Sequence, residues 1–112
     1  MSFWGHEAMA TIDAETAETE IAQGAQVIDV GEPNEWLGGH IPGALLVEPE
    51  LVDNAAKELA KDRPVIVAGR NADVAAGCAA YLHDHGFQVA ILAGGAAAWH
   101  SSGRALAHPK GD

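Results

Sequence analysis

A series of short apolar segments constrains this chain more than any other feature. They lie at residues 26–30, 44–47, 64–68 and 88–92. None of them alternates polar with apolar residues, so each strand that they predict must be covered on both faces. Helical patterns separate them, at residues 14–22, 32–37, 50–60, 72–85 and from the Gly94-Gly95 turn through Trp99. This alternation of strands and helices predicts an α/β fold with a parallel sheet between helices.

Several helix ends carry their own signals. Asp13 is a candidate N-cap for the helix over 14–22, and Gly24 stands just past its end. Gly86 ends the helix over 72–85 in the same way. The helix over 50–60 places five apolar residues on one face, which predicts that this face is buried. They are Leu51, Val52, Ala55, Ala56 and Leu59.

The length of 112 residues is that of one domain. Residues 1–10 have no periodic pattern and are expected to form a flexible N-terminal arm. Residues 11–106 are then the folded domain, and 107–112 a frayed tail.

Charge and cysteine content exclude several classes of protein. Six basic and sixteen acidic residues give a net charge of −10, which argues against nucleic acid and anionic membranes as partners. The chain has no apolar stretch long enough to span a membrane and no basic leader at residues 1–7, so neither a membrane helix nor a signal peptide is expected. One cysteine allows no intramolecular disulfide, and we expect a cytoplasmic protein.

Five motifs, in order, resemble the rhodanese-homology domains. They cover residues 12–106 as Ile28-Asp29-Val30-Gly31-Glu32-Pro33-Asn34-Glu35-Trp36, Gly39-His40-Ile41-Pro42-Gly43-Ala44, Pro64-Val65-Ile66-Val67, Gly86-Phe87-Gln88-Val89, and Leu92-Ala93-Gly94-Gly95 with Trp99 and Gly103. The resemblance implies a three-layer α/β/α domain with a central, mainly parallel sheet of about five strands. It also implies an active-site loop after the strand over 65–68. In the family this loop begins with a cysteine whose thiolate accepts a sulfane sulfur from a donor such as thiosulfate.

The corresponding loop of this chain has no nucleophile. Counting back from Gly86 places Gly69 at the cysteine position, and the loop runs Gly69-Arg70-Asn71-Ala72-Asp73-Val74-Ala75. The family usually has glycine at position 72, a basic residue or serine at 74, and serine or threonine at 75. The polar residues of the family at positions 74 and 75 are thus missing together with the cysteine. We therefore expect a retained scaffold that has lost sulfurtransferase chemistry.

The remaining candidates each have a structural and a functional interpretation. Cys78 lies on the apolar helix face with Val74, Tyr81 and Leu82, which favours a buried thiol over a displaced nucleophile. Asn71 is expected to cap the helix. Asp73 is either an ordinary helix-start residue or a carboxylate that repels anions. Arg70 is either a solvated surface residue or a ligand contact.

Other positions are expected to support the fold. The resemblance implies structural roles for Asp29 and His40 in the loops beside the site, and Trp36 and Trp99 are expected in packing. Six histidines show no metal-ligand spacing, so no metal and no cofactor are expected.

The leading hypothesis is a catalytically inactive binding or regulatory module. Its partner is expected to be another protein, with a small ligand at the 69–75 loop as a further option. The alternative is a thiosulfate or persulfide sulfurtransferase that uses Cys78 or a partner's cysteine. A third option, phosphatase-like activity, fails because the loop lacks both the thiol and a final arginine.

Overall fold

The structure is a computed structural model that describes residues 10–69 and 71–108. Five strands form one sheet: β1 (Ala10–Ile12), β2 (Gln26–Asp29), β3 (Leu45–Leu46), β4 (Val65–Ala68) and β5 (Val89–Leu92). The strand order is β1-β5-β4-β2-β3, and every neighbouring pair is parallel. The expected central parallel sheet of five strands is therefore confirmed.

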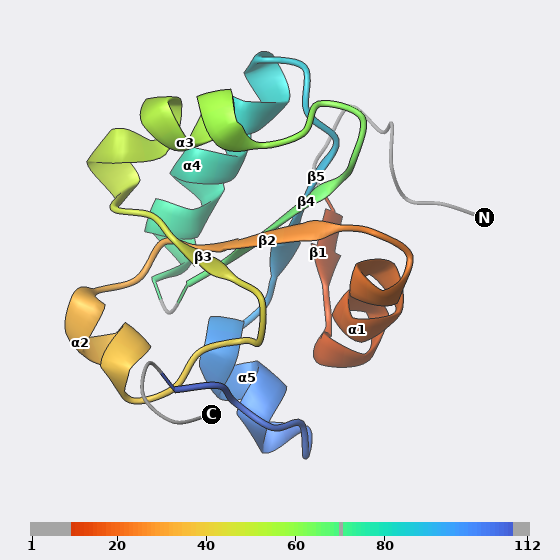
Figure 1. Cartoon of the computed structure of the whole chain (residues 1–112), viewed down its shortest axis with the longest axis vertical. Coiled ribbons are helices and arrows are strands. Elements are labelled where there is room, and N and C mark those ends of the chain that lie inside the picture. The colour runs from red at the N-terminus through yellow and green to blue at the C-terminus, as the bar shows by residue number, and fades with distance from the viewer. Residues whose placement is uncertain (1–9, 70, 109–112) are drawn as a thin grey trace.

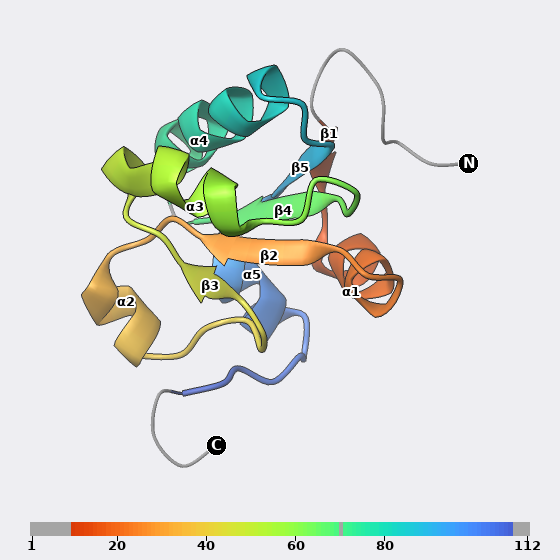
Figure 2. The ribbon, with the colours of Figure 1, turned by 45° about the horizontal axis from the view of Figure 1, so that its top comes forward.

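Helices cover both faces of this sheet, which gives the expected three layers (Figures 1 and 2). The helices are α1 (Ala14–Ala22), α2 (Pro33–Leu37), the 3₁₀ turn η1 (Pro49–Leu51), α3 (Val52–Glu58), α4 (Ala72–Asp84) and α5 (Gly95–Ser101). α3 and α4 pack on one face, and α1 and α5 on the other. α2 lies beyond the end of β2, beside the edge strand β3.

The core consists of two clusters of buried residues, one on each face of the sheet, because the strands are apolar on both faces. On β4 all four residues are buried, with Val65 and Val67 in the cluster under α3 and α4, and Ile66 and Ala68 in the cluster on the α1 and α5 side. This division is the one that alternating side-chain directions along a strand require. No helix within the described residues is long and apolar enough to cross a membrane.

The helix ends follow their local signals. The Asp13 side chain accepts a hydrogen bond from the Thr16 backbone N–H at 2.9 Å, and this bond lowers the pKa of the Asp13 carboxyl. α1 then ends at Ala22, and Gly24 has a φ of +112°, a conformation that suits glycine.

The structure extends the folded part by one residue at each end of the expected range. Ala10 is the first residue of β1, and Ala107 pairs with His40 in an antiparallel bridge. Ala10 therefore does not belong to a flexible arm, and Ala107 does not belong to a frayed tail. Residues 1–9 of the expected arm and 109–112 of the tail lie outside the described residues.

The helix expected over 50–60 is divided and shorter. Its first turn is the 3₁₀ helix η1, which starts at Pro49, and α3 ends at Glu58. A 3₁₀ turn has 3.0 residues per turn against 3.6 in an α-helix, so Leu51 leaves the face that Val52 and Ala55 bury. Leu51 is 43% exposed, contrary to the expectation of a buried residue.

Candidate functional site

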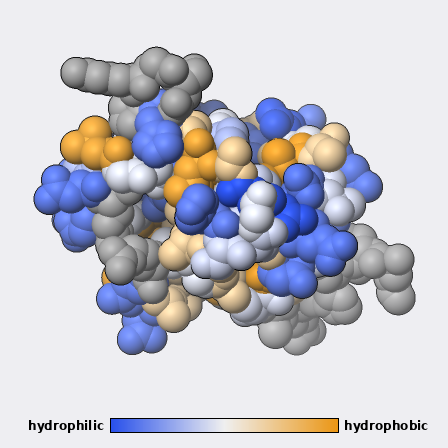
Figure 3. Space-filling view, turned by 90° about the horizontal axis from the view of Figure 1, so that it is seen from below, coloured by the Kyte–Doolittle hydropathy of each residue, from blue (hydrophilic) through white to orange (hydrophobic). Residues whose placement is uncertain are grey.

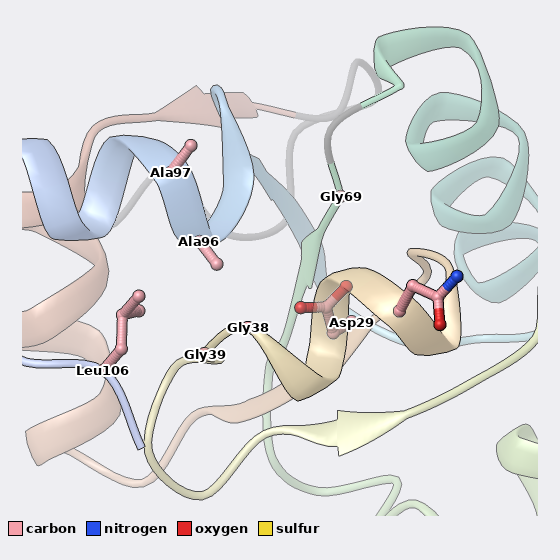
Figure 4. A pocket seen from close by; sticks show the side chains of 8 residues that line it. Asp29, Gly38, Gly39, Gly69, Ala96, Ala97 and Leu106 are labelled. Carbon is pink, nitrogen blue, oxygen red and sulfur yellow. The ribbon is translucent and has the colours of Figure 1, made fainter. Parts of the chain in front are cut away.

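A cavity of about 280 Å³ lies at the carboxyl ends of β2 and β4. This edge is where ligands bind in parallel α/β sheets. Asp29 and Gly69 contribute from the strand ends, Asn34 from α2, and Ala96 and Ala97 from α5 (Figure 4). The other lining residues are Gly38, Gly39 and Leu106. Asp29 is the one charged residue among them.

Gly69 contributes only backbone to this cavity, since its side chain is a hydrogen atom. A Cβ at this position would lie 3.0 Å from Val30 Cγ2 and at least 3.7 Å from other atoms outside its chain neighbours. That contact is tight, and Val30 is buried in the core cluster under α3 and α4. A side chain at position 69 would therefore require Val30 to shift by a few tenths of an ångström.

The turn after β5 holds the backbone of Gly69 in place. Gly95 has a φ of +58°, and a Cβ on it would lie 2.9 Å from both the backbone N and the carbonyl carbon of Gly69. Only glycine allows this approach. The Gly94-Gly95 turn therefore packs directly against the backbone of the candidate site.

Asp29 and His40 are the two buried polar or charged residues in the described part of the chain. Asp29 Oδ1 accepts a hydrogen bond from the Gly31 N–H at 3.0 Å. The His40 ring stacks on Trp36 at 3.6 Å between centroids, and His40 exchanges two backbone hydrogen bonds with Ala107. The bond to Gly31 is local to the loop after β2, while the His40 contacts connect α2, the loop before β3 and the C-terminal segment.

Backbone N–H groups in the first turn of α4 have hydrogen-bond partners within the chain itself. The Asn71 side-chain oxygen accepts from the N–H groups of Asp73 at 2.9 Å and Val74 at 3.1 Å, and the Asn71 carbonyl accepts from Ala75. Asn71 is thus the N-cap of α4. Two N–H groups that could bind an anion at a free helix N-terminus, those of Asp73 and Val74, therefore already have partners here.

We expect the substitution Asn71→Ala to destabilise the fold by about 1 kcal/mol, because it removes the two side-chain hydrogen bonds of the cap. Urea unfolding followed by circular dichroism measures this loss. Asn71→Ser is the matched control and should lose much less, since serine also caps helices. Equal losses for the two variants would contradict the capping role.

The rest of the 69–75 loop forms the first turns of α4. Asp73 is exposed in the first turn, Ala72 is exposed, Val74 is partly buried against the core and Ala75 is buried. None of these four lines the cavity. Arg70 lies outside the described residues.

Cys78 does not line the cavity and lies on the opposite face of the sheet from the lining residues Ala96 and Leu106. It is 5% exposed and belongs to the core cluster beneath α3 and α4. Burial raises the pKa of the Cys78 thiol, and the Glu50 carboxylate raises it further. A raised pKa leaves the thiol protonated at neutral pH, and a protonated thiol is a poor nucleophile.

The sequence indicated Asp29 and Gly69 at the strand ends of the site but did not indicate the part of the wall that α5 and the C-terminal segment supply. Ala96, Ala97 and Leu106 carry no chemical signal, and the chain reaches Leu106 through an irregular segment. Within the described residues, no group of three or more His, Cys, Asp or Glu side chains lies close enough to hold a metal ion.

Comparison with known proteins agrees with this architecture. The sequence model of the rhodanese-like domain family matches residues 13–102 of this chain. A protein of Allochromatium vinosum named sulfurtransferase is 32% identical over 89% of this chain and 96% of its own length. The thiosulfate sulfurtransferase GlpE of Pseudomonas fluorescens is 34% identical over 81% of this chain and 84% of its own.

A solved structure has the same fold. The rhodanese-related protein of Thermoplasma volcanium superposes with a TM-score of 0.78 at 22% identity, covering 88% of this chain and 97% of that protein. At this identity the likeness concerns the arrangement of the sheet and helices.

Proposed function

This chain belongs to the rhodanese-like domain family, and we propose that it is a member without sulfurtransferase turnover that acts by binding another protein. One observation carries the proposal: the residue that follows β4 and lines the cavity is Gly69, which has no side chain to attack a sulfur donor.

The chemistry of the family requires a thiolate at this place. A thiolate attacks the sulfane sulfur of thiosulfate, the bond between the two sulfur atoms breaks, and sulfite leaves with the electron pair of that bond. The persulfide then passes its outer sulfur to an acceptor. Gly69 can take part in neither step.

Three further observations support loss of turnover. The N–H groups of Asp73 and Val74 are bonded to Asn71 rather than being available to a bound sulfur anion. Among the described residues that line the cavity, none has a basic side chain that would attract thiosulfate. Cys78, the sole thiol, is buried beneath α3 and α4.

The second candidate is a sulfurtransferase that uses Cys78, and the sulfurtransferase names of relatives favour it. Thiocyanate formation from thiosulfate and cyanide separates the two candidates. We expect the native chain to form thiocyanate no faster than the reaction without protein, while the GlpE protein of Pseudomonas fluorescens serves as the active control.

The substitution Cys78→Ser identifies the source of any activity that is found. Turnover that this variant abolishes would overturn the proposal in favour of the second candidate. Turnover that survives the substitution would come from a contaminant, because the variant has no thiol.

The binding role has its own test. Ala97 is an exposed cavity residue on α5, so Ala97→Phe should fill the cavity with little effect on the core. A protein captured from a cell extract by the native chain and not by Ala97→Phe would support recognition at this site. Identical captures by both chains would contradict it.

A further inference from the structure

A second concave surface is lined by residues of α2, β3, η1 and α3. It is a groove of about 350 Å³, a volume within the range of roughly 300–1,000 Å³ that ligand pockets occupy. Its lining is Pro33, Leu46, Val47, Glu48, Leu51, Asn54, Ala55 and Glu58. No residue lines both the groove and the cavity at Gly69.

The floor of the groove is apolar and includes a side chain that the fold leaves uncovered. Leu46 comes from β3, the last strand of the sheet on this side, and Ala55 comes from α3. Leu51 of η1 also lines the groove and is 43% exposed, because the 3₁₀ turn directs it away from the core. Leu37, Leu45 and Leu51 are the large apolar residues that stay exposed in the described part of the chain.

The rim of the groove is acidic. Glu48 and Glu58 line it and are exposed, and no lysine or arginine is among its described lining residues. Glu50 and Asp53 are also exposed, on the turns beside the groove. Lys57 is the one basic residue of η1 and α3. The whole chain carries ten more acidic than basic side chains, so the surrounding field is also negative.

By contrast, the face seen from below carries apolar residues scattered among hydrophilic ones, without a single continuous apolar patch (Figure 3). An exposed leucine over a concave apolar floor with a charged rim has the composition of an interface, with an apolar centre and a polar edge.

We propose that this groove is a docking site for a basic segment of a partner protein, whose apolar side chain packs on Leu51 while its lysine or arginine residues pair with Glu48 and Glu58. Complementary charge selects this occupant. A second copy of the chain fits poorly, because a two-fold contact would bring the same carboxylates of both copies together. The proposal goes beyond the proposed function and does not depend on whether Gly69 abolishes turnover.

A fluorescein-labelled peptide with a Leu-Val-Leu centre between two Lys-Arg pairs tests the proposal by fluorescence anisotropy. We expect saturable binding to the full chain that weakens as salt rises, since surface charge pairs are screened. The same peptide with glutamate in place of each lysine and arginine should not bind. Equal binding of both peptides, or no binding of the basic peptide, would overturn the proposal.

Matched variants locate the binding. Leu51→Gln should weaken it by about tenfold or more, because it replaces a central apolar contact by a polar amide, while Leu37→Gln, at an exposed leucine outside the groove, should not. The pair Glu48→Gln and Glu58→Gln should reduce affinity and its salt dependence. The control pair Glu15→Gln and Asp84→Asn makes the same change in net charge and should have a small effect.

Two results would contradict the groove as the site even if the peptide binds. One is binding that weakens equally in the groove variants and their controls, which would indicate non-specific attraction to an acidic protein. The other is self-association of the native chain in sedimentation experiments that Leu51→Gln abolishes, which would assign the groove to a second copy of the chain.

Discussion

Replacing Gly95 by alanine should destabilise the fold by about 3 kcal/mol or more. The backbone of Gly95 has a φ of +58°, where an L side chain is strained. The added Cβ would lie 2.9 Å from two backbone atoms of Gly69, and backbone at a strand end cannot rotate away as a side chain can. Both effects act against the native state, so their free energies should add. Chemical denaturation monitored by circular dichroism measures the loss.

Gly77→Ala is the matched control. Gly77 lies within α4, and a Cβ there would meet no atom within 4 Å. Alanine favours a helix interior over glycine, so this variant should be stabilised by up to about 1 kcal/mol. Similar destabilisation of both variants would contradict the close approach of Gly95 to Gly69.

Truncation of Trp99 should cost about 3–5 kcal/mol, the usual loss when a large aromatic side chain in a core is replaced by alanine. Trp99 is 7% exposed and packs in the cluster on the α1 and α5 side. Its Nε1–H also donates to the Ala105 carbonyl at 2.9 Å, and the Arg104 guanidinium lies 5.7 Å from the ring centroid. Trp99→Ala should therefore also release the segment that carries Leu106 to the cavity.

Trp99→Phe separates packing from hydrogen bonding. It keeps most of the apolar contact and loses the bond to Ala105, so it should cost less than half as much as Trp99→Ala. Amide hydrogen exchange gives a second readout, because the His40 and Ala107 N–H groups should exchange faster in Trp99→Ala than in the native chain. Unchanged exchange at both amides would contradict the link between Trp99 and this segment.

The sequence predicted the architecture because its strongest signals are those that burial imposes. Apolar runs such as Val65–Ala68 have no polar residue to place on a solvent face, and the intervening helices carry recognisable caps at Asp13 and Asn71. Together these patterns were sufficient for the parallel sheet, its two helical layers and the position of the loop after β4.

Short elements and irregular segments were missed because they lack periodicity. β1 has three residues and lies at the edge of the sheet, where its pairing with β5 decides its conformation. Leu106 lines the cavity because Trp99 bonds to Ala105 and His40 pairs with Ala107, which fixes the C-terminal segment. No local sequence pattern indicates these long-range contacts. The exposure of Leu51 depends on the 3₁₀ turn at Pro49, which apolar periodicity alone does not predict.

The intact mass of the protein after treatment with thiosulfate, without reductant, tests the central claim most directly. A sulfurtransferase would retain one sulfane sulfur as a persulfide and gain about 32 Da, the mass of one sulfur atom. Because Gly69 has no thiol and Cys78 is buried and protonated, we predict that the folded chain keeps its native mass. A gain of one sulfur atom that the substitution Cys78→Ser removes would contradict this account.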